Sequence, residues 1–377
     1  MKKLLALLLC LTMVFALAAC TKKDPETPPA GGDDETPGDE VRPIKVVNLI
    51  NGTLGDLSFF DSAENGMKML KQELGDKFEY STQELSYDNN KWEPALLDAS
   101  EDPTVDVIIC GTWQMQEVLE KHADEFPEKT YILYDASVNW AGGDYKNVHC
   151  IEYKQNEGSY LAGVLAASMT QSGKIGFLGG MDNPVINDFL VGYIQGAKSV
   201  KDDIKIMQSF VGNFNDSAKG AELSGVQFAS GVDIGFACAG QAGLGMFEAA
   251  VNAGGKDSGL RMIGVDSDQA MVFEENGQLD RATLTTTSML KRVDISLYRA
   301  ILDYMDGKLQ MKVTNRVGIE EGCIGLADNK YYQELVPDEV KTAVKAAEDE
   351  IVGGSVTVVT ALGMPQDELD AYKNAVK

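Results

Sequence analysis

The chain is 377 residues long and carries 33 Lys and Arg against 58 Asp and Glu, which gives a formal net charge of -25. An acidic excess of this size repels polyanions and argues against a nucleic acid as the partner. The body that follows residue 42 is longer than one hydrophobic core usually supports, which argues against a single small domain.

The amino terminus has the order of features that is typical of an export signal. Lys2 and Lys3 supply positive charge, residues 4–17 form an almost uncharged apolar run, and small residues follow. The apolar run is too short to span a bilayer comfortably. We therefore predict that residues 1–19 are a signal peptide.

The end of this signal, Leu17-Ala18-Ala19-Cys20, resembles the lipobox of bacterial lipoproteins. The resemblance implies cleavage before Cys20 and attachment of lipid to its thiol, which would place the protein on the extracytoplasmic face of the cell membrane. A plain secreted protein with an incidental cysteine is the alternative. Residues 20–42 are rich in Pro, Gly, Thr, Asp and Glu and show no apolar periodicity, so they predict a disordered tether.

The chain contains six cysteines. Cys10 would leave with the signal and Cys20 would carry lipid, and the others are Cys110, Cys150, Cys238 and Cys323. Because these four are scattered through apolar stretches, we expect buried thiols. Their spacing matches neither a dense disulfide framework nor a zinc site, but a disulfide pair among them stays possible outside the cytoplasm.

From residue 44 onward, short β-rich runs alternate with helical stretches. The predicted strands cover residues 44–50, 78–85, 105–111, 130–136 and 148–153, and then 174–180, 204–211, 232–240 and 262–266. Helices are predicted at residues 61–74, 155–170, 189–200, 218–230 and 243–253. This alternation is typical of parallel βαβ units, and the continuous apolar character of the strands indicates sheets that are covered on both faces.

Two consecutive series of such units predict an α/β protein with two lobes, each a parallel sheet flanked by helices. We assign residues 43–150 to the first lobe, completed by about 270–311. The second lobe takes residues 151–269 and is completed by about 312–365.

Ligands of open parallel sheets sit beyond the carboxyl ends of the strands, so the residues after each strand are candidates for a site. These segments are rich in Gly, Asp and aromatic residues: 52–60, 111–113, Asp135, 179–184, 212–216, 240–245 and 266–269. The pattern predicts a cleft that many loops form together.

The residues that would perform catalysis are missing from the sequence. It has only two histidines, His122 and His149, and no G-x-S-x-G turn, which argues against a Ser-His-Asp hydrolase. Asp266-Ser267-Asp268 is too little for a metal site. Residues 240–245 read G-x-x-G-x-G instead of the dinucleotide pattern G-x-G-x-x-G. We predict a binding protein without enzymatic activity, cofactor or metal.

Five segments in order resemble motifs of the basic membrane protein family, and they are 55–60 (GDLSFF), 174–180 (KIGFLGG), 240–245 (GQAGLG), 263–269 (IGVDSDQ) and 288–294 (SMLKRVD). The resemblance runs from about residue 44 to 358, and it is to the PnrA-type nucleoside-binding lipoproteins of ABC importers. It implies the type I periplasmic-binding fold, with two lobes that are joined by three crossover strands and close over a purine nucleoside.

The resemblance also implies the residues that would bind the ligand. Phe59 matches the aromatic of the D-x-S-F motif, to which Asp56 also belongs, and Phe214 lies where the opposite lobe supplies a second aromatic, so the two rings would sandwich a base. Asp135 would accept hydrogen bonds from the base edge, and Asp266 would bind the ribose hydroxyls.

Two further residues follow from the same motifs. Gly240 would offer backbone groups to the sugar, and Lys291 matches a lysine that the family places beside the ligand. Each candidate residue has a structural alternative, such as a core phenylalanine, a strand-end cap or a surface charge.

Two departures from the family pattern bear on specificity. Phe60 stands where most members have Asn, and Asn51 follows Ile50 where members commonly carry an aspartate. Both changes remove hydrogen-bonding groups from the expected base edge, and loss of such partners shifts specificity. Trp113, at the mouth of the expected cleft, could provide a compensating aromatic contact.

We therefore predict a lipid-anchored, monomeric substrate-binding protein that captures a purine nucleoside and passes it to an ABC permease. Two alternatives stay open. The same fold could bind another ring-bearing or sugar-like solute, or the protein could be a surface or sensory lipoprotein that does not transport.

Overall fold

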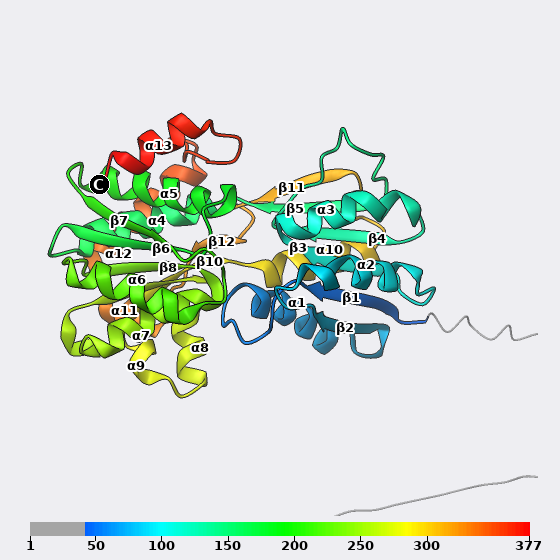
Figure 1. Ribbon diagram of the computed structural model, residues 1–377, viewed down its shortest axis with the longest axis horizontal. Helices are drawn as coiled ribbons and strands as arrows, with labels where there is room; N and C mark the ends of the chain where they lie inside the picture. Colours follow the sequence, from blue (N-terminus) through cyan, green and yellow to red (C-terminus); the bar gives the residue numbers. More distant parts are fainter. Residues whose placement is uncertain (1–41) are drawn as a thin grey trace, which may run out of the picture. The chain divides into compact units, whose positions relative to one another are not determined.

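The protein contains two six-stranded sheets, each flanked by helices (Figure 1). The computed structural model describes residues 42–377. The predicted signal peptide, the lipidation site Cys20 and the predicted tether up to residue 41 lie outside the described residues. Within residues 42–377, no helix is both long enough and apolar enough to cross a bilayer.

The first sheet has the strand order β11-β5-β4-β3-β1-β2, and all its pairings are parallel. Its strands are β1 (Ile44–Ile50), β2 (Phe78–Glu84), β3 (Val107–Gly111), β4 (Thr130–Tyr134), β5 (Val148–Tyr153) and β11 (Val313–Val317). The helices of this lobe are α1 (Phe59–Leu74), α2 (Trp92–Glu101), α3 (Thr112–His122) and α10 (Val293–Met305).

The second sheet has the order β12-β10-β9-β8-β6-β7, and only its edge strand β12 runs antiparallel. Its strands are β6 (Lys174–Gly179), β7 (Lys205–Phe210), β8 (Ile234–Cys238), β9 (Arg261–Asp266), β10 (Thr285–Lys291) and β12 (Ile324–Leu326). Its helices are α4 (Gln155–Met169), α5 (Pro184–Val200), α6 (Ser217–Ala229), α7 (Leu244–Asn252), α8 (Gln269–Glu275), α9 (Leu279–Ala282), α11 (Lys330–Leu335), α12 (Asp338–Val352) and α13 (Gln366–Asn374). Short 3-10 turns are Gly75–Lys77, Asn89–Lys91, Ala123–Glu125, Gly240–Gly243 and Gly255–Ser258.

These elements confirm the predicted α/β class, with two parallel-dominated sheets flanked by helices. The predicted helix at 189–200 begins earlier, at Pro184. Asn183 caps it, because its side-chain oxygen accepts a hydrogen bond from the Ile186 N–H (2.9 Å), and proline is well suited to the first helical position.

Both faces of the first sheet are buried, as its apolar strands predicted. Successive residues of a strand point to opposite faces, and Val46 and Val47 of β1 belong to two different apolar clusters. Ile109 and Cys110, which are neighbours in β3, likewise belong to the two different clusters.

The four cysteines of the described chain are buried free thiols, as expected; they are Cys110, Cys150, Cys238 and Cys323.

The sheet pairing corrects the predicted completion of the lobes at two strands. Residues 270–311 were expected to complete the first lobe, but β10 pairs with β9 in the second sheet. Residues 312–365 were expected to complete the second lobe, but β11 pairs with β5 in the first. The chain leaves the second sheet only after β10, and this depends on long-range pairing that the local pattern does not reveal.

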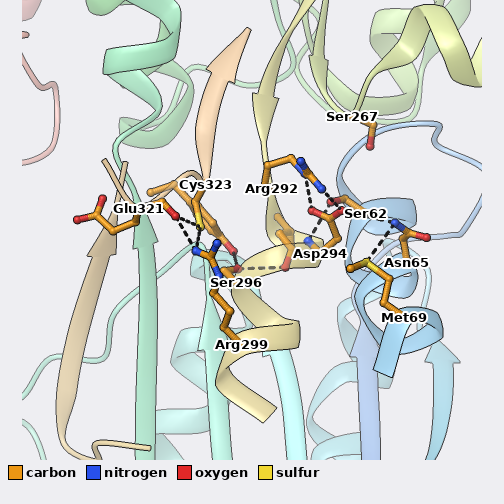
Figure 2. Close-up of polar contacts among 12 residues, drawn as sticks. Ser62, Asn65, Met69, Ser267, Arg292, Asp294, Ser296, Arg299, Glu321 and Cys323 are labelled. Carbon is orange, nitrogen blue, oxygen red and sulfur yellow. Dashed lines mark hydrogen bonds and ion pairs between the residues drawn. The ribbon is translucent and has the colours of Figure 1, made fainter. Parts of the chain in front are cut away.

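The chain passes between the sheets after β5, after β10 and between β11 and β12, and polar contacts join these crossovers (Figure 2). The Arg292 N–H donates to the Cys323 carbonyl (2.8 Å), and the Arg292 guanidinium donates to both carboxylate oxygens of Asp294 (2.9 Å each). Arg299 Nη1 donates to the Glu321 carbonyl (2.6 Å). The crossovers are thus tied together beside the sheets that they connect.

Candidate functional site

The carboxyl ends of the strands in both sheets border one pocket. Its walls come from the residues at or after the ends of nearly all the inner strands, and it encloses about 690 Å³ when the open space at its mouth is included.

Every residue that the sequence marked as a ligand contact lines this pocket. The first lobe supplies Asn51, Asp56, Phe59, Phe60, Trp113 and Asp135, and the second supplies Phe214, Gly240, Asp266 and Lys291. Trp113 is 40% exposed and so stands at the mouth. The structure brings the predicted set together because parallel strands end at a common edge. Contact with a ligand stays a prediction.

Further residues of the lining were not singled out from the sequence as ligand contacts: Tyr87, Thr112, Gln114, Asn183, Val185, Ile186, Phe189, Cys238 and Val265. Thr112 lies within the segment 111–113 that the strand-end rule marked, and Gln114 directly follows this segment after β3. Tyr87 lies in a loop after β2 and Phe189 lies within α5, and no motif marks either position.

Asp135 and Asp266 hold strained backbone positions at the pocket. Asp135 follows β4 and Asp266 ends β9, with φ of 61° and 64°. Non-glycine residues seldom adopt this region, and such strain concentrates at functional sites. Burial raises the pKa of Asp135, and it raises the pKa of Asp266 to about 6, although the positive charge of Lys291 opposes both shifts.

Lys291, at the end of β10, brings a positive charge into this buried region. Its side chain is 2% exposed, and Nζ forms an ion pair with Asp135 Oδ1. Nζ also lies 5.2 Å from the ring centroid of Phe59, 5.1 Å from that of Tyr153 and 5.3 Å from that of Phe189. A buried ammonium is costly without partners, and here a carboxylate and aromatic faces surround it.

Aromatic rings enter the pocket from both lobes. Phe59 opens α1 in the first lobe, with its centroid 5.2 Å from that of Phe60 and 5.4 Å from that of Tyr134. Phe214 comes from the loop after β7 in the second lobe, and its ring lies so close to Gly180 that a Cβ there would approach it to 2.3 Å. Glycine at position 180 therefore makes room for the Phe214 ring.

Asp56 anchors the start of α1. Its Oδ1 accepts hydrogen bonds from the N–H groups of Ser58 (3.0 Å) and Asp61 (3.1 Å), and its Oδ2 accepts from the Phe60 N–H (2.9 Å). A carboxylate at a helix N-terminus satisfies backbone donors that otherwise lack partners. Burial raises the pKa of Asp56 to about 7, and these hydrogen bonds oppose the shift. Through this cap, Asp56 fixes Phe59 and Phe60.

Asn51 and Phe60, the two residues that depart from the pattern implied by the resemblance, both line the pocket from the first lobe. Asn51 Nδ2 donates to Thr112 Oγ1 (2.9 Å) and Gln114 Oε1 (3.1 Å). Phe60 is buried against Gly52, where a Cβ would come within 2.1 Å of the ring. The first lobe thus presents amides and a ring to the pocket.

The chemistry of the lining suits binding. It combines aromatic faces, the carboxyl groups of Asp56, Asp135 and Asp266, and one ammonium, which together can hold a flat ring and hydroxyl groups. Cys238 is the thiol of the lining, and burial raises its pKa well above the ordinary value. Because the thiolate is the reactive form, Cys238 is a poor nucleophile.

Comparison with known proteins identifies the family to which the chain belongs. Residues 44–355 match the Bmp family model, described as ABC transporter substrate-binding protein PnrA-like. The chain is 30% identical over 361 residues to the ABC transporter nucleoside-binding protein BmpA of Lactococcus lactis subsp. cremoris, with 92% of this chain and 96% of that protein covered. It is also 30% identical over 320 residues to basic membrane protein A of Borreliella afzelii, covering 83% and 91%.

Solved structures show the same fold. An ABC transporter solute-binding protein from Aeropyrum pernix K1 superimposes with a TM-score of 0.76 at 25% identity, covering 88% of this chain and 98% of that chain. A solute-binding protein from Conexibacter woesei has a TM-score of 0.67 at 19% identity, covering 84% and 99%, which supports the fold alone.

Proposed function

The chain belongs to the family of PnrA-like ABC transporter substrate-binding proteins, and from this premise we propose that it captures a purine nucleoside for import. The ligand would lie in the pocket between the two lobes and would pass to a membrane permease after capture.

The observation that carries this proposal is the pair Phe59 and Phe214, which line one pocket from opposite lobes. A planar base between two such rings gains about 1–3 kcal/mol per base from stacking. The relative from Lactococcus lactis is named a nucleoside-binding protein, which supports the same ligand class.

The carboxyl groups of the pocket are suited to binding the ribose of a nucleoside. Asp266 Oδ1 accepts no hydrogen bond from the described residues, and Asp135 lies beside the Lys291 ammonium. Ionised carboxylates bind hydroxyl donors strongly, and the ammonium can donate to a ribose oxygen. We propose that Asp135, Asp266 and Lys291 hold the sugar.

The proposed role includes no chemical step. Burial raises the pKa of the Cys238 thiol in the lining well above its ordinary value, which argues against a thiolate nucleophile there. Specificity would come from stacking and hydrogen bonding alone.

The amino-terminal sequence supports the proposed location. Lys2, Lys3 and the apolar run of residues 4–17 precede the Leu17-Ala18-Ala19-Cys20 segment. We propose that lipid on Cys20 holds the protein at the outer face of the cell membrane, next to its permease. Metabolic labelling with a radioactive fatty acid would test this, since Cys20→Ala should abolish the label.

Identification of the bound solute tests the ligand. Mass spectrometry of small molecules released from the purified protein should recover purine nucleosides. Calorimetry should then show binding of adenosine, guanosine or inosine. No heat with any of them, together with tight binding of another solute, would contradict the proposal.

A second candidate keeps the fold and changes the solute. The family resemblance implies an aspartate near position 51 and an asparagine at position 60, where this chain has Asn51 and Phe60, and both of these residues line the pocket. This favours a different ring-bearing or sugar-like ligand as the alternative. Recovery of such a solute, without nucleosides, would select it.

A further inference from the structure

A turn of the first lobe, residues 55–58, contacts the second lobe just before α1 begins, and we name it the clasp turn. Ser58 Oγ donates to Asp266 Oδ2 (2.7 Å), and the Ser58 carbonyl accepts from Ser267 Oγ (2.9 Å). The Leu57 carbonyl accepts from Gln269 Nε2 (3.0 Å). Each bond joins residues more than 200 positions apart in sequence, and Figure 2 shows Ser267 beside the loop that leads into α1.

The Leu57 side chain adds an apolar contact to these bonds. It packs against a cluster in the second lobe that includes Leu178, Ala239 and Phe273, and the other described members of that cluster all belong to the second lobe. Burial of apolar surface is favourable at roughly 25 cal/mol per Å². The clasp turn therefore joins the lobes by both hydrogen bonds and hydrophobic contact.

The first lobe itself holds the clasp turn in shape. Asp61 Oδ1 accepts from the Gly55 N–H (2.8 Å), and Asp61 Oδ2 accepts from the Leu57 N–H (2.9 Å). Leu57 has a φ of 53°, a left-handed conformation that is unfavourable for a leucine. The surrounding contacts impose this conformation, and strained residues of this kind are concentrated in functional segments.

The clasp turn is adjacent to the ligand pocket on both sides. Phe59 directly follows Ser58 and lines the pocket, and Asp266 lines it from the second lobe. Ser58 occupies Oδ2 of Asp266, whereas Oδ1 accepts no hydrogen bond from the described residues. Ser58 thus fixes the orientation of the carboxylate and leaves one oxygen for a ligand.

We propose that Ser58 is a positioning residue for Asp266 and that the clasp turn couples ligand binding to lobe closure. This inference rests on the proposed capture function. A ligand that contacts Phe59 and Asp266 stabilises the closed arrangement of the lobes, in which the clasp turn bonds to the second lobe. The clasp turn in return stabilises the closed arrangement and so slows ligand release.

Dissociation kinetics test the coupling. With adenosine, guanosine and inosine as probes, stopped-flow tryptophan fluorescence should show faster release from Ser58→Ala, by about tenfold or more for a lost hydrogen bond to a charged group. Ser58→Thr keeps the hydroxyl and should restore slow release. Leu57→Ala should also speed release.

Ser100→Ala is the matched control, because Ser100 is buried and its hydroxyl bonds only to the Leu96 carbonyl and to Tyr131 within the first lobe. Its release rates should equal those of the unaltered protein. Equal release from Ser58→Ala and the control would overturn the clasp.

Small-angle scattering of the ligand-free protein separates this inference from the proposed function. Ser58→Ala and Leu57→Ala should have a larger radius of gyration than the unaltered protein, because the lobes open. If no nucleoside binds the unaltered protein, the proposed ligand is wrong, and the radius of gyration alone then tests the role of the clasp turn. An unchanged radius of gyration in Ser58→Ala and Leu57→Ala would show that the clasp turn does not hold the lobes together.

Discussion

Asn51 donates both of its side-chain N–H groups within the first lobe, to Thr112 Oγ1 (2.9 Å) and to Gln114 Oε1 (3.1 Å). Its Oδ1 is buried and accepts no hydrogen bond from any residue between 42 and 377. A buried acceptor without a partner destabilises the ligand-free protein, so a ligand N–H that donates to it should bind more tightly. At Asn51 the pocket thus offers a neutral acceptor in a fixed orientation.

Replacing this acceptor should weaken binding. We predict that Asn51→Leu lowers the affinity for guanosine by about 1–3 kcal/mol in calorimetry, because the ligand donor then lacks a partner. Asn48→Leu is the control, since Asn48 is also buried on β1 with an unpartnered Oδ1 but does not line the pocket. Equal losses in the two variants would show that the effect is structural.

The Phe214 ring should contribute stacking energy. We predict that Phe214→Ala weakens nucleoside binding by about 1–3 kcal/mol in calorimetry. Gly180→Ala should also weaken it, because its Cβ would lie 2.3 Å from the ring and displace it. Gly225→Ala, in open space on α6, should leave the affinity unchanged. Full affinity in a folded Phe214→Ala variant would remove this ring from the site.

Lys291 and Asp135 form a buried ion pair, so substitutions at the two positions should have non-additive effects on the free energy of unfolding. We predict that Lys291→Met lowers the free energy of unfolding by about 3–5 kcal/mol, because it leaves the Asp135 charge buried and unpaired. Adding Asp135→Asn should recover part of this loss. Urea unfolding of both single variants and the double variant measures this interaction. If the losses of the two single variants simply add in the double variant, the ion pair does not contribute as predicted.

Asp266 should make stability depend on pH. Burial raises its pKa from 3.8 to about 6, so the folded protein favours the protonated carboxyl. Its contribution to stability is therefore full below the unfolded pKa and is lost as pH rises through the folded pKa.

Between about pH 4 and pH 6, we predict that the free energy of unfolding of the unaltered protein falls relative to Asp266→Asn, by up to about 3 kcal/mol. Urea unfolding at stepped pH values measures the difference. A difference that grows in the opposite direction would contradict the raised pKa.

Much of the fold and of the pocket lining could be predicted from local pattern. Apolar runs and turn residues placed β1 to β9 within a few residues, since these signals depend on neighbours in the chain. The strand-end rule and five motifs then named residues as distant as Asn51 and Lys291, which line one pocket.

The tertiary structure decided which of these residues touch. Residues 270–311 and 312–365 were expected to complete the first and the second lobe, but β10 and β11 within these ranges join the opposite sheets, because sheet membership depends on pairing with distant strands. The same holds for Lys291 with Asp135 and for Ser58 with Asp266, which are far apart in sequence. Periodicity reports which face of an element is buried, but the partner across a buried contact depends on how two lobes pack, and only three-dimensional geometry specifies that.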